Sequence, residues 1–509
     1  MAAWVAAAAA QNSPPPAART ALPRTAEGKP DLSGIWQVSD SIPAGDLRDH
    51  AARYDMRGGR SVVVGGEIPY QMQVSAKRTE NFENRRNADP LGQCDMAGVP
   101  RIMYMDFPFQ IFQTPQAVAM TFEWSLVYRL IYTDGSSHPQ GLEFWMGDSR
   151  GQWEGDTLVV DVANNNGKTW FDLAGDFHSD ALHVVERYRM TDPDTIAYEA
   201  TIEDPKTFTK PWTLRVAFKR RTELGDRILE YGCQSEKEEA NGAFAREERT
   251  WYKDGGTLPA PPSPAIPWPA RATTRTEIAK PNFQGFYQSD GGGGNYGLEK
   301  HARESHGFTP GGRGVIIDPP DGTLPMLPWA VEETISRNLP ERGYDDPTAH
   351  CFPAGIPRSM YIPSPLQIIQ TPDYIVFLHE RMAWRIVSLK RNTHLPDSIR
   401  LWQGDSIGRW EGPTLVVDTA NLNGKTWLNE VGQIVSHAER VVERFTEVSP
   451  GTINYEATVT DPLVYSRPWT IAFPLHAEKG GLLEVACHED DQDLAHLKQI
   501  KDAAAARKK

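Results

Sequence analysis

The chain of 509 residues is long enough for two or three domains, each able to bury its own hydrophobic core. Hydrophobic residues make up 39% and charged residues 24%, as in a globular protein, while 40 Pro and 42 Gly interrupt the chain too often for long helices. The net charge of −14 disfavours nucleic acid or an anionic membrane surface as a partner, because both would repel the chain.

The N-terminal segment MAAWVAAAAAQ is typical of the end of a secretory signal peptide that lacks its basic start. We therefore predict that residues 1–27 are a signal remnant and linker, and that the protein is periplasmic or secreted. A tail of Ala and Pro without a targeting role is the alternative. The apolar stretch is far shorter than the roughly 20 residues that cross a bilayer, so no membrane span is expected.

Short runs of alternating apolar residues follow, separated by turn signals every 8–12 residues, which is typical of an antiparallel sandwich or barrel. The predicted strands are 110–112, 117–122, 126–132, 141–146, 157–162, 182–188, 196–202 and 212–218. Hairpin turns are expected at 134–135, 147–151, 154–156 and 191–194, where Gly and Asp gather. No stretch has a 3.6-residue period longer than about three turns. An all-β fold is therefore predicted.

The second half of the chain repeats the first at an offset of 257 residues. Cys94 matches Cys351, and 20 of the 26 residues in Trp145–Trp170 are identical in Trp402–Trp427. Chance does not supply such a match, so the chain consists of two diverged copies of one unit. The predicted domains are residues 28–254 and 275–495, joined by a Pro-rich linker at 255–274 and followed by a charged tail at 496–509.

Four cysteines permit three pairings, and the repeat selects Cys94–Cys233 with Cys351–Cys487, because each of these bonds lies within one copy. Such bonds would place the protein in an oxidising compartment. Four buried free thiols in a cytoplasmic protein are the alternative.

The residues Gly34-Ile35-Trp36 resemble the first strand of lipocalin-like β-barrels, and Gly285-Phe286-Tyr287 is a weaker second copy. The wider pattern, KPDLSGIW followed by C…PR, QTP, WxGDSxGxWEGxTLVVD and YEATxxDP, is similar to an uncharacterised exported bacterial family. The resemblance implies two tandem antiparallel lipocalin-like barrels. Paired domains of this kind occur in some hydratases that act on apolar substrates, which supplies an analogy for function.

The strand predicted at 182–188 places Glu186 on its apolar, inward face, because side chains alternate along a strand. A carboxylate inside a barrel is costly unless it is protonated or paired, and either state suits a general acid or base. Its candidate partners are Arg101, Glu123 and Arg129, with counterparts at Arg358, Glu380 and, allowing one residue of slip, Arg385. A purely structural Arg–Glu pair is the alternative.

His178 precedes this strand and is predicted to exchange a proton with the substrate, because imidazole titrates near neutrality; His183 is a second candidate. Both could instead be ordinary polar residues without a catalytic role. Trp145, Tyr188 and Tyr198 are candidate ligand-binding residues, although packing alone would explain them.

The sequences Gly147–Gly151 and Gly404–Gly408 match the Gly-x-Ser-x-Gly pattern of serine hydrolases. A helix must follow such a serine, whereas here a turn and a strand follow, so a serine hydrolase is not expected. No metal-ligand signature or phosphate-binding loop is found, and no cofactor is expected.

We therefore predict an exported, cofactor-independent acid–base enzyme of the lyase, hydratase or isomerase type, acting on an apolar or aromatic small molecule in a barrel pocket. The alternative is a non-catalytic lipocalin-like protein that binds a hydrophobic ligand. The sequence does not decide the oligomeric state.

Overall fold

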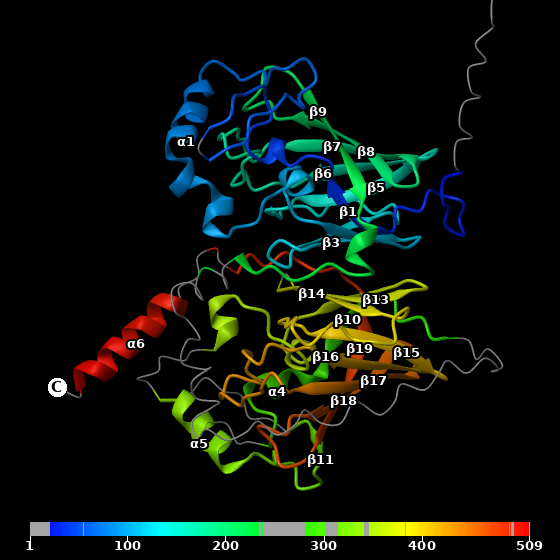
Figure 1. Ribbon diagram of the computed structural model, residues 1–509, viewed down its shortest axis with the longest axis vertical. Helices are drawn as coiled ribbons and strands as arrows, with labels where there is room; N and C mark the ends of the chain where they lie inside the picture. The colour runs from blue at the N-terminus through cyan, green and yellow to red at the C-terminus, as the bar shows by residue number, and fades with distance from the viewer. Residues whose placement is uncertain are drawn as a thin grey trace, which may run out of the picture.

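The structure is a computed structural model that describes residues 21–53, 55–233, 237, 280–300, 314–339, 346–381, 383–487, 489 and 493–507. Two β-barrels lie one above the other in Figure 1, the first formed by the blue to green part of the chain and the second by the part that runs from green through yellow to red. The predicted all-β class and the duplication into tandem barrels are confirmed. The predicted linker at 255–274 lies outside the described residues, as does 1–20 of the predicted N-terminal segment.

The first barrel consists of nine strands, in which each strand pairs with the next and the last closes on the first. The strands are β1 (Gly34–Val38), β2 (Phe109–Gln113), β3 (Ala117–Phe122), β4 (Tyr128–Tyr132), β5 (Asp148–Glu154), β6 (Thr157–Ala163), β7 (His183–Asp192), β8 (Thr195–Glu203) and β9 (Trp212–Arg220). Its helices are α1 (Ser75–Ala88) and the 3₁₀ turns η1 (Ile42–Ala44), η2 (Pro90–Gln93), η3 (Arg101–Tyr104) and η4 (Thr222–Leu224).

The second barrel repeats this order and closes through pairing of its first strand with its last, to which one short extra strand is added. Its strands are β10 (Gly285–Ser289), β11 (Ile316–Asp318), β12 (Leu366–Gln370), β13 (Tyr374–His379), β14 (Ala383–Ser388), β15 (Asp405–Glu411), β16 (Thr414–Ala420), β17 (Arg440–Ser449), β18 (Thr452–Thr460) and β19 (Trp469–Glu478). Its helices are η5 (Asp290–Gly292), α4 (Gly293–Tyr296), α5 (Pro328–Arg337), η7 (Pro347–His350), η8 (Arg358–Met360) and α6 (Asp493–Arg507), the last covering most of the predicted charged tail.

The barrels are not strictly antiparallel, which corrects the prediction. Strand β4 runs parallel to β5, with Ile131 opposite Ser149, and β14 runs parallel to β15 in the same way. A parallel pair needs a long crossover, which residues 133–147 supply in the first barrel. The predicted strand at 141–146 is wrong, because only an isolated bridge from Phe144 to Asn165 forms there.

The predicted turn at 147–151 is also wrong beyond its first residue, since strand β5 begins at Asp148. Gly147 has a φ of 67°, a conformation that favours glycine, and it makes the turn by itself. Gly151 lies within the strand, where a Cβ would meet Ile131 Cγ2 at 2.8 Å. This close approach explains a glycine inside β5.

Helix α1 was not expected, because its sequence SAKRTENFENRRNA is almost entirely polar. Only Asn81 of this helix is buried, so no apolar stripe marks it in the sequence. None of the helices described here is long and apolar enough to cross a membrane.

The barrels pack against each other through the outer faces of neighbouring strands. The shared apolar core includes Phe112, Ala119 and Tyr128 from the first barrel and Val376, Leu378 and Trp384 from the second. The indole Nε1 of Trp384 donates to the backbone oxygen of Phe122 at 3.0 Å, which ties the two sheets together.

Two crossing segments, residues 226–233 and 480–487, each leave their own barrel to contact the other. Glu230 accepts a hydrogen bond from the backbone N–H of Trp402 at 2.6 Å, and Glu484 accepts one from that of Trp145 at 2.5 Å. Burial raises the pKa of both carboxyl groups to about 7, against the lowering effect of these N–H groups. The exchange is reciprocal and fixes one barrel against the other.

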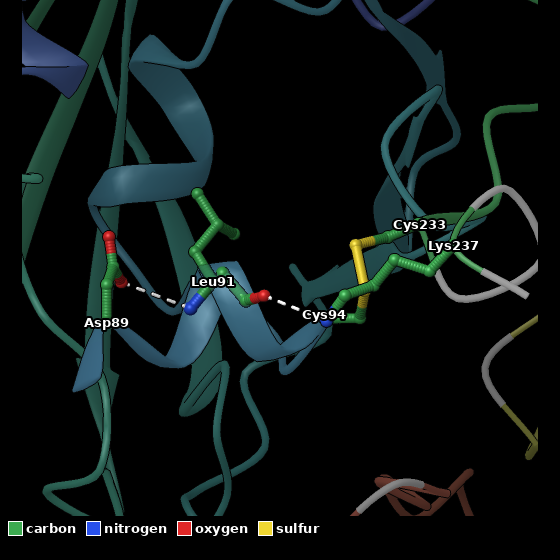
Figure 2. Close-up of a disulfide and its surroundings, with 6 residues drawn as sticks. Asp89, Leu91, Cys94, Cys233 and Lys237 are labelled. Atoms are coloured by element: carbon green, nitrogen blue, oxygen red, sulfur yellow. Dashed lines mark hydrogen bonds between the residues drawn. A yellow bond between two sulfur atoms is a disulfide. The ribbon is translucent and has the colours of Figure 1, made fainter. Parts of the chain in front are cut away.

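Each crossing segment ends at a disulfide that returns it to its own copy. Figure 2 shows Cys94, directly after η2, bonded to Cys233. The Cα atoms of this pair lie 5.5 Å apart, and those of Cys351 and Cys487 lie 5.7 Å apart. The predicted pairing is confirmed.

Candidate functional site

Glu186 lies inside the first barrel, on the inward face of β7, as predicted. Its oxygens are occupied by three side chains: Arg129 donates to both of them, while the hydroxyls of Tyr188 and Tyr198 donate to Oε1 at 2.9 and 2.7 Å. Arg129 also donates from Nε to Ser149 Oγ at 3.0 Å. The group is a closed, fully buried ion pair.

The second barrel repeats this ion pair with Arg385 and Glu443, and the hydroxyl of Tyr455 donates to Glu443 Oε1 at 2.9 Å. The one-residue slip that aligned Arg129 with Arg385 is therefore present in the structure. The closed pair is therefore a structural feature that both barrels share, although the copies differ elsewhere.

Arg101 and Glu123, the other predicted partners of Glu186, contact different groups. Arg101 forms two hydrogen bonds of 2.7 Å with Asp89, which itself caps η2 by accepting from Leu91 N–H (Figure 2). Glu123 Oε2 accepts from the backbone N–H of Leu229 in a crossing segment at 3.1 Å. Arg101 thus fixes the turn before Cys94.

The candidate histidines form local contacts. His178 is buried, its Nε2 lies 2.7 Å from Thr169 Oγ1, and burial lowers its pKa. His183 Nε2 lies 3.1 Å from Asp161 at the barrel surface. Among the described residues no hydrogen bond joins either histidine to Glu186.

Trp145, a predicted ligand-binding residue, is buried in the core of the first barrel and contacts the crossing segment of the second. Its indole Nε1 donates to Glu489 at 2.7 Å, and its backbone N–H donates to Glu484. Tyr188 and Tyr198, the other two, belong to the buried ion pair. The serine of the first Gly-x-Ser-x-Gly pattern, Ser149, lies within β5, which continues where the sequence predicted a hairpin turn.

One carboxylate group among the described residues has oxygens close enough to hold a metal ion: Asp46, Asp172 and Asp176, within 4.8 Å of one another. Asp172 accepts from the backbone N–H groups of Leu47 and Asp176, both at 3.0 Å. Arg48 and Tyr70 donate to Asp176, each at 3.0 Å. These contacts make the group a hydrogen-bonded internal network.

A pocket opens instead at the end of the second barrel, where the two barrels meet. Its empty space, counted together with the open solvent at its mouth, is about 830 Å³. Apolar residues form most of its wall, together with three half-cystines. The lining comprises Ser125, Leu126, Gly232, Cys233, Thr348, Cys351, Phe352, Pro353, Ala354, Ser359, Ile362, Ser364, His379, Arg381, Ala383, Gln403 and Cys487.

Three buried polar side chains of this wall have unfilled hydrogen-bonding capacity. Ser359 in η8, His379 at the end of β13 and Gln403 before β15 are 7%, 6% and 1% exposed. Ser359 Oγ, His379 Nε2 and both amide atoms of Gln403 have no hydrogen-bond partner among the described residues. A buried polar atom without a partner costs about 1–3 kcal/mol. The pocket therefore favours a molecule that satisfies these atoms.

Burial and the positive charge of Arg385 lower the pKa of His379 to about 3. The imidazole in the pocket is therefore neutral at physiological pH, and it can donate or accept a hydrogen bond but carries no charge.

The first barrel has no such polar set at the aligned positions. Ser359, His379 and Gln403 correspond to Ile102, Phe122 and Met146 at the offset of 257, and all three apolar residues are buried in the core of the first barrel. The polar set is therefore particular to the second copy.

Three aromatic rings fill the corresponding region of the first barrel. Phe107, Trp124 and Tyr231 pack with ring centroids 4.9–5.3 Å apart. Ser364 and Arg381 stand at the positions of Phe107 and Trp124, while Val485 aligns with Tyr231 through the cysteine two residues later. The loss of these rings explains why the second barrel is open there.

Sequence reasoning missed this pocket because it searched for features that the copies share. The signal lay in their differences, which replace a cluster of large apolar residues by polar or small ones. The histidines that the sequence singled out, His178 and His183, lie in the first copy instead.

The fold and pocket define a protein of two tandem β-barrels, each copy with one disulfide, and a mainly apolar pocket at their junction. No model of a known protein family matches the sequence, and a search of curated proteins also finds no match.

Proposed function

We propose that the protein binds a hydrophobic small molecule in the pocket between its barrels. One observation carries the proposal: a mainly apolar pocket at the second barrel is lined by four buried polar atoms that have no hydrogen-bond partner within the described part of the chain, whereas side chains fill the first barrel. Apolar walls with a few convergent polar groups are typical of ligand sites, because the walls supply affinity and the polar groups supply orientation. Binding of this kind needs no cofactor.

The acid–base enzyme predicted from the sequence stays a prediction. It would require Glu186 to exchange a proton with a substrate, although Arg129 and two tyrosines occupy the oxygens of this carboxylate. The neutral His379 in the pocket better suits hydrogen bonding than proton transfer near neutral pH, because a general base works best with a pKa near the working pH. These features favour binding over catalysis.

We further propose that the chain is an exported, lipocalin-like binding protein. Two disulfides in a single chain support an oxidising compartment, and closed barrels with a ligand cavity support the likeness to lipocalins. Expression of the full chain in bacteria, followed by cell fractionation and thiol alkylation, tests export. Reduced cysteines in a cytoplasmic fraction would contradict it.

The ligand site is tested with the neutral fluorophore N-phenyl-1-naphthylamine, whose emission rises in an apolar site. One bound molecule per chain is expected. A filled variant carrying Ser364→Phe, Arg381→Trp and Val485→Tyr restores the residues of the first barrel and should abolish binding. Because the first barrel accommodates these three rings, the variant is expected to keep its circular dichroism spectrum and melting temperature.

The matched control is Met72→Trp, which adds an indole at a position that is 90% exposed and distant in sequence from the pocket. Fluorophore binding should be unchanged in this variant. Equal binding by the filled variant and the original protein would overturn the proposed site. Two equivalent sites per chain would do the same, because the first barrel is filled.

A further inference from the structure

The chemical class of the ligand follows from the distribution of polar groups around the pocket, and this inference rests on the proposed function. The walls are formed mainly by Leu126, Phe352, Pro353, Ile362 and Ala383. Such a surface can accept a compact ring system, because burial of the apolar ring in the pocket is favourable for binding. The body of the ligand is therefore apolar.

The buried part of the pocket supplies both donors and acceptors. Ser359 can donate and accept, the amide of Gln403 offers a donor and an acceptor, and the neutral imidazole of His379 offers either at Nε2. A hydroxyl group matches this set, because it donates one hydrogen bond and accepts two. A charged group would be buried without a counter-ion here, which is strongly unfavourable.

The mouth differs from the interior in charge. Of the described residues that line the pocket, Arg381 alone is charged, and it is exposed to solvent. Its charge also lowers the pKa of nearby Glu430, although burial raises the pKa of that carboxyl overall. A guanidinium group at the rim can pair with a carboxylate that remains partly hydrated.

We infer that the ligand is a hydroxy acid with an apolar ring body, whose uncharged hydroxyl group contacts Ser359, His379 and Gln403 and whose carboxylate lies beside Arg381 at the mouth. Neither the hydroxyl group nor the carboxylate alone would match both the buried polar atoms and the arginine at the mouth. The hydroxyl satisfies the buried atoms, while the carboxylate accounts for Arg381, which stands where the first barrel has Trp124.

Isothermal titration with three matched naphthalenes tests this inference. The probes are 6-hydroxy-2-naphthoate, 2-naphthoate without the hydroxyl, and 2-naphthol without the carboxylate. Removal of the hydroxyl should weaken binding about tenfold, since it leaves buried polar atoms unsatisfied. Removal of the carboxylate should weaken binding about fivefold, as expected for a partly exposed ion pair.

Two variants assign each effect to its residue. Gln403→Met introduces the residue of the first barrel and should reduce the preference for the hydroxyl while leaving the preference for the carboxylate. Arg381→Gln should do the reverse. Because each variant changes one preference and serves as the control for the other, a general loss of folding cannot imitate the pattern.

The outcomes separate the two proposals. If N-phenyl-1-naphthylamine binds but the three naphthalenes bind equally or not at all, the ligand class is wrong and the pocket remains a binding site. If a preference exists but neither variant changes it, the assignment to these residues is wrong. If none of the four probes binds, the proposed function fails, and the ligand class fails with it.

Discussion

Acid should destabilise the second barrel through His379, and the size of the effect follows from its burial. The pKa of this imidazole is lowered to about 3 by burial and by Arg385, against an ordinary value of 6.5 in the unfolded chain. Between these values the unfolded state binds one more proton, so stability falls as the pH falls. Each pH unit costs about 1.4 kcal/mol, which gives about 2 kcal/mol near pH 5.

The perturbation is His379→Phe, which introduces the residue that occupies the aligned position in the first barrel, Phe122. The free energy of unfolding of both proteins is measured in urea near pH 7 and near pH 5. Pulsed hydrogen–deuterium exchange, read on peptides of the second barrel, separates its unfolding from that of the first. The variant should lose about 2 kcal/mol less than the original protein on acidification.

The comparison between pH values cancels any change in packing that the larger ring causes. Peptides of the first barrel supply the internal control, because their transition should not respond to the variant. An equal loss of stability in both proteins would refute the reasoning and would mean that the imidazole is protonated, or reaches water, in the folded state.

Three further predictions concern the barrels and the disulfide at the pocket. Arg129→Met leaves the charge of Glu186 uncompensated and should cost about 3–5 kcal/mol in urea unfolding, while adding Glu186→Gln should recover at least half; a loss below about 1 kcal/mol would contradict a structural ion pair. Replacing Cys351 and Cys487 by serine should cost about 5 kcal/mol, given their separation of 136 residues, and should weaken N-phenyl-1-naphthylamine binding. Unchanged melting would exclude a stabilising bond. Gly151→Val should lower the unfolding free energy by about 1–3 kcal/mol, because the valine side chain would collide with Ile131 in β4. An unchanged midpoint of urea unfolding would contradict this, since it would mean that β4 and β5 can move apart without cost.

The sequence predicted the ion pair through alternation along one strand. Val184, Glu186 and Tyr188 were expected on one face, and all three are buried in the barrel. The sequence did not select the partner of the carboxylate, because Arg101, Glu123 and Arg129 were all candidates. Only the register of β3, β4 and β5 decides that Arg129 reaches the interior, and pairing between strands leaves no mark in the sequence of any one of them.

The pocket, unlike the position of Glu186, could not be predicted from the sequence of either copy. Residues 102, 122 and 146 and their counterparts are scattered along each copy, and nothing local distinguishes His379 from a histidine on a barrel surface. Their convergence depends on the closure of the barrel and on the crossing segment that carries Cys233 to the junction. A comparison of the two copies would have revealed the substitutions but not the space between them.

By itself the sequence determined the all-β class, the duplication and the pairing of the four cysteines, because alternation, identity at a fixed offset and the repeated spacing are properties of the chain. The tertiary structure alone decided which arginine pairs with Glu186, that β4 and β5 run parallel, and that the second barrel is open where the first is filled. These features depend on contacts between residues far apart in sequence. Local preferences do not encode such distances, since they arise only when the sheet closes and the two barrels pack together.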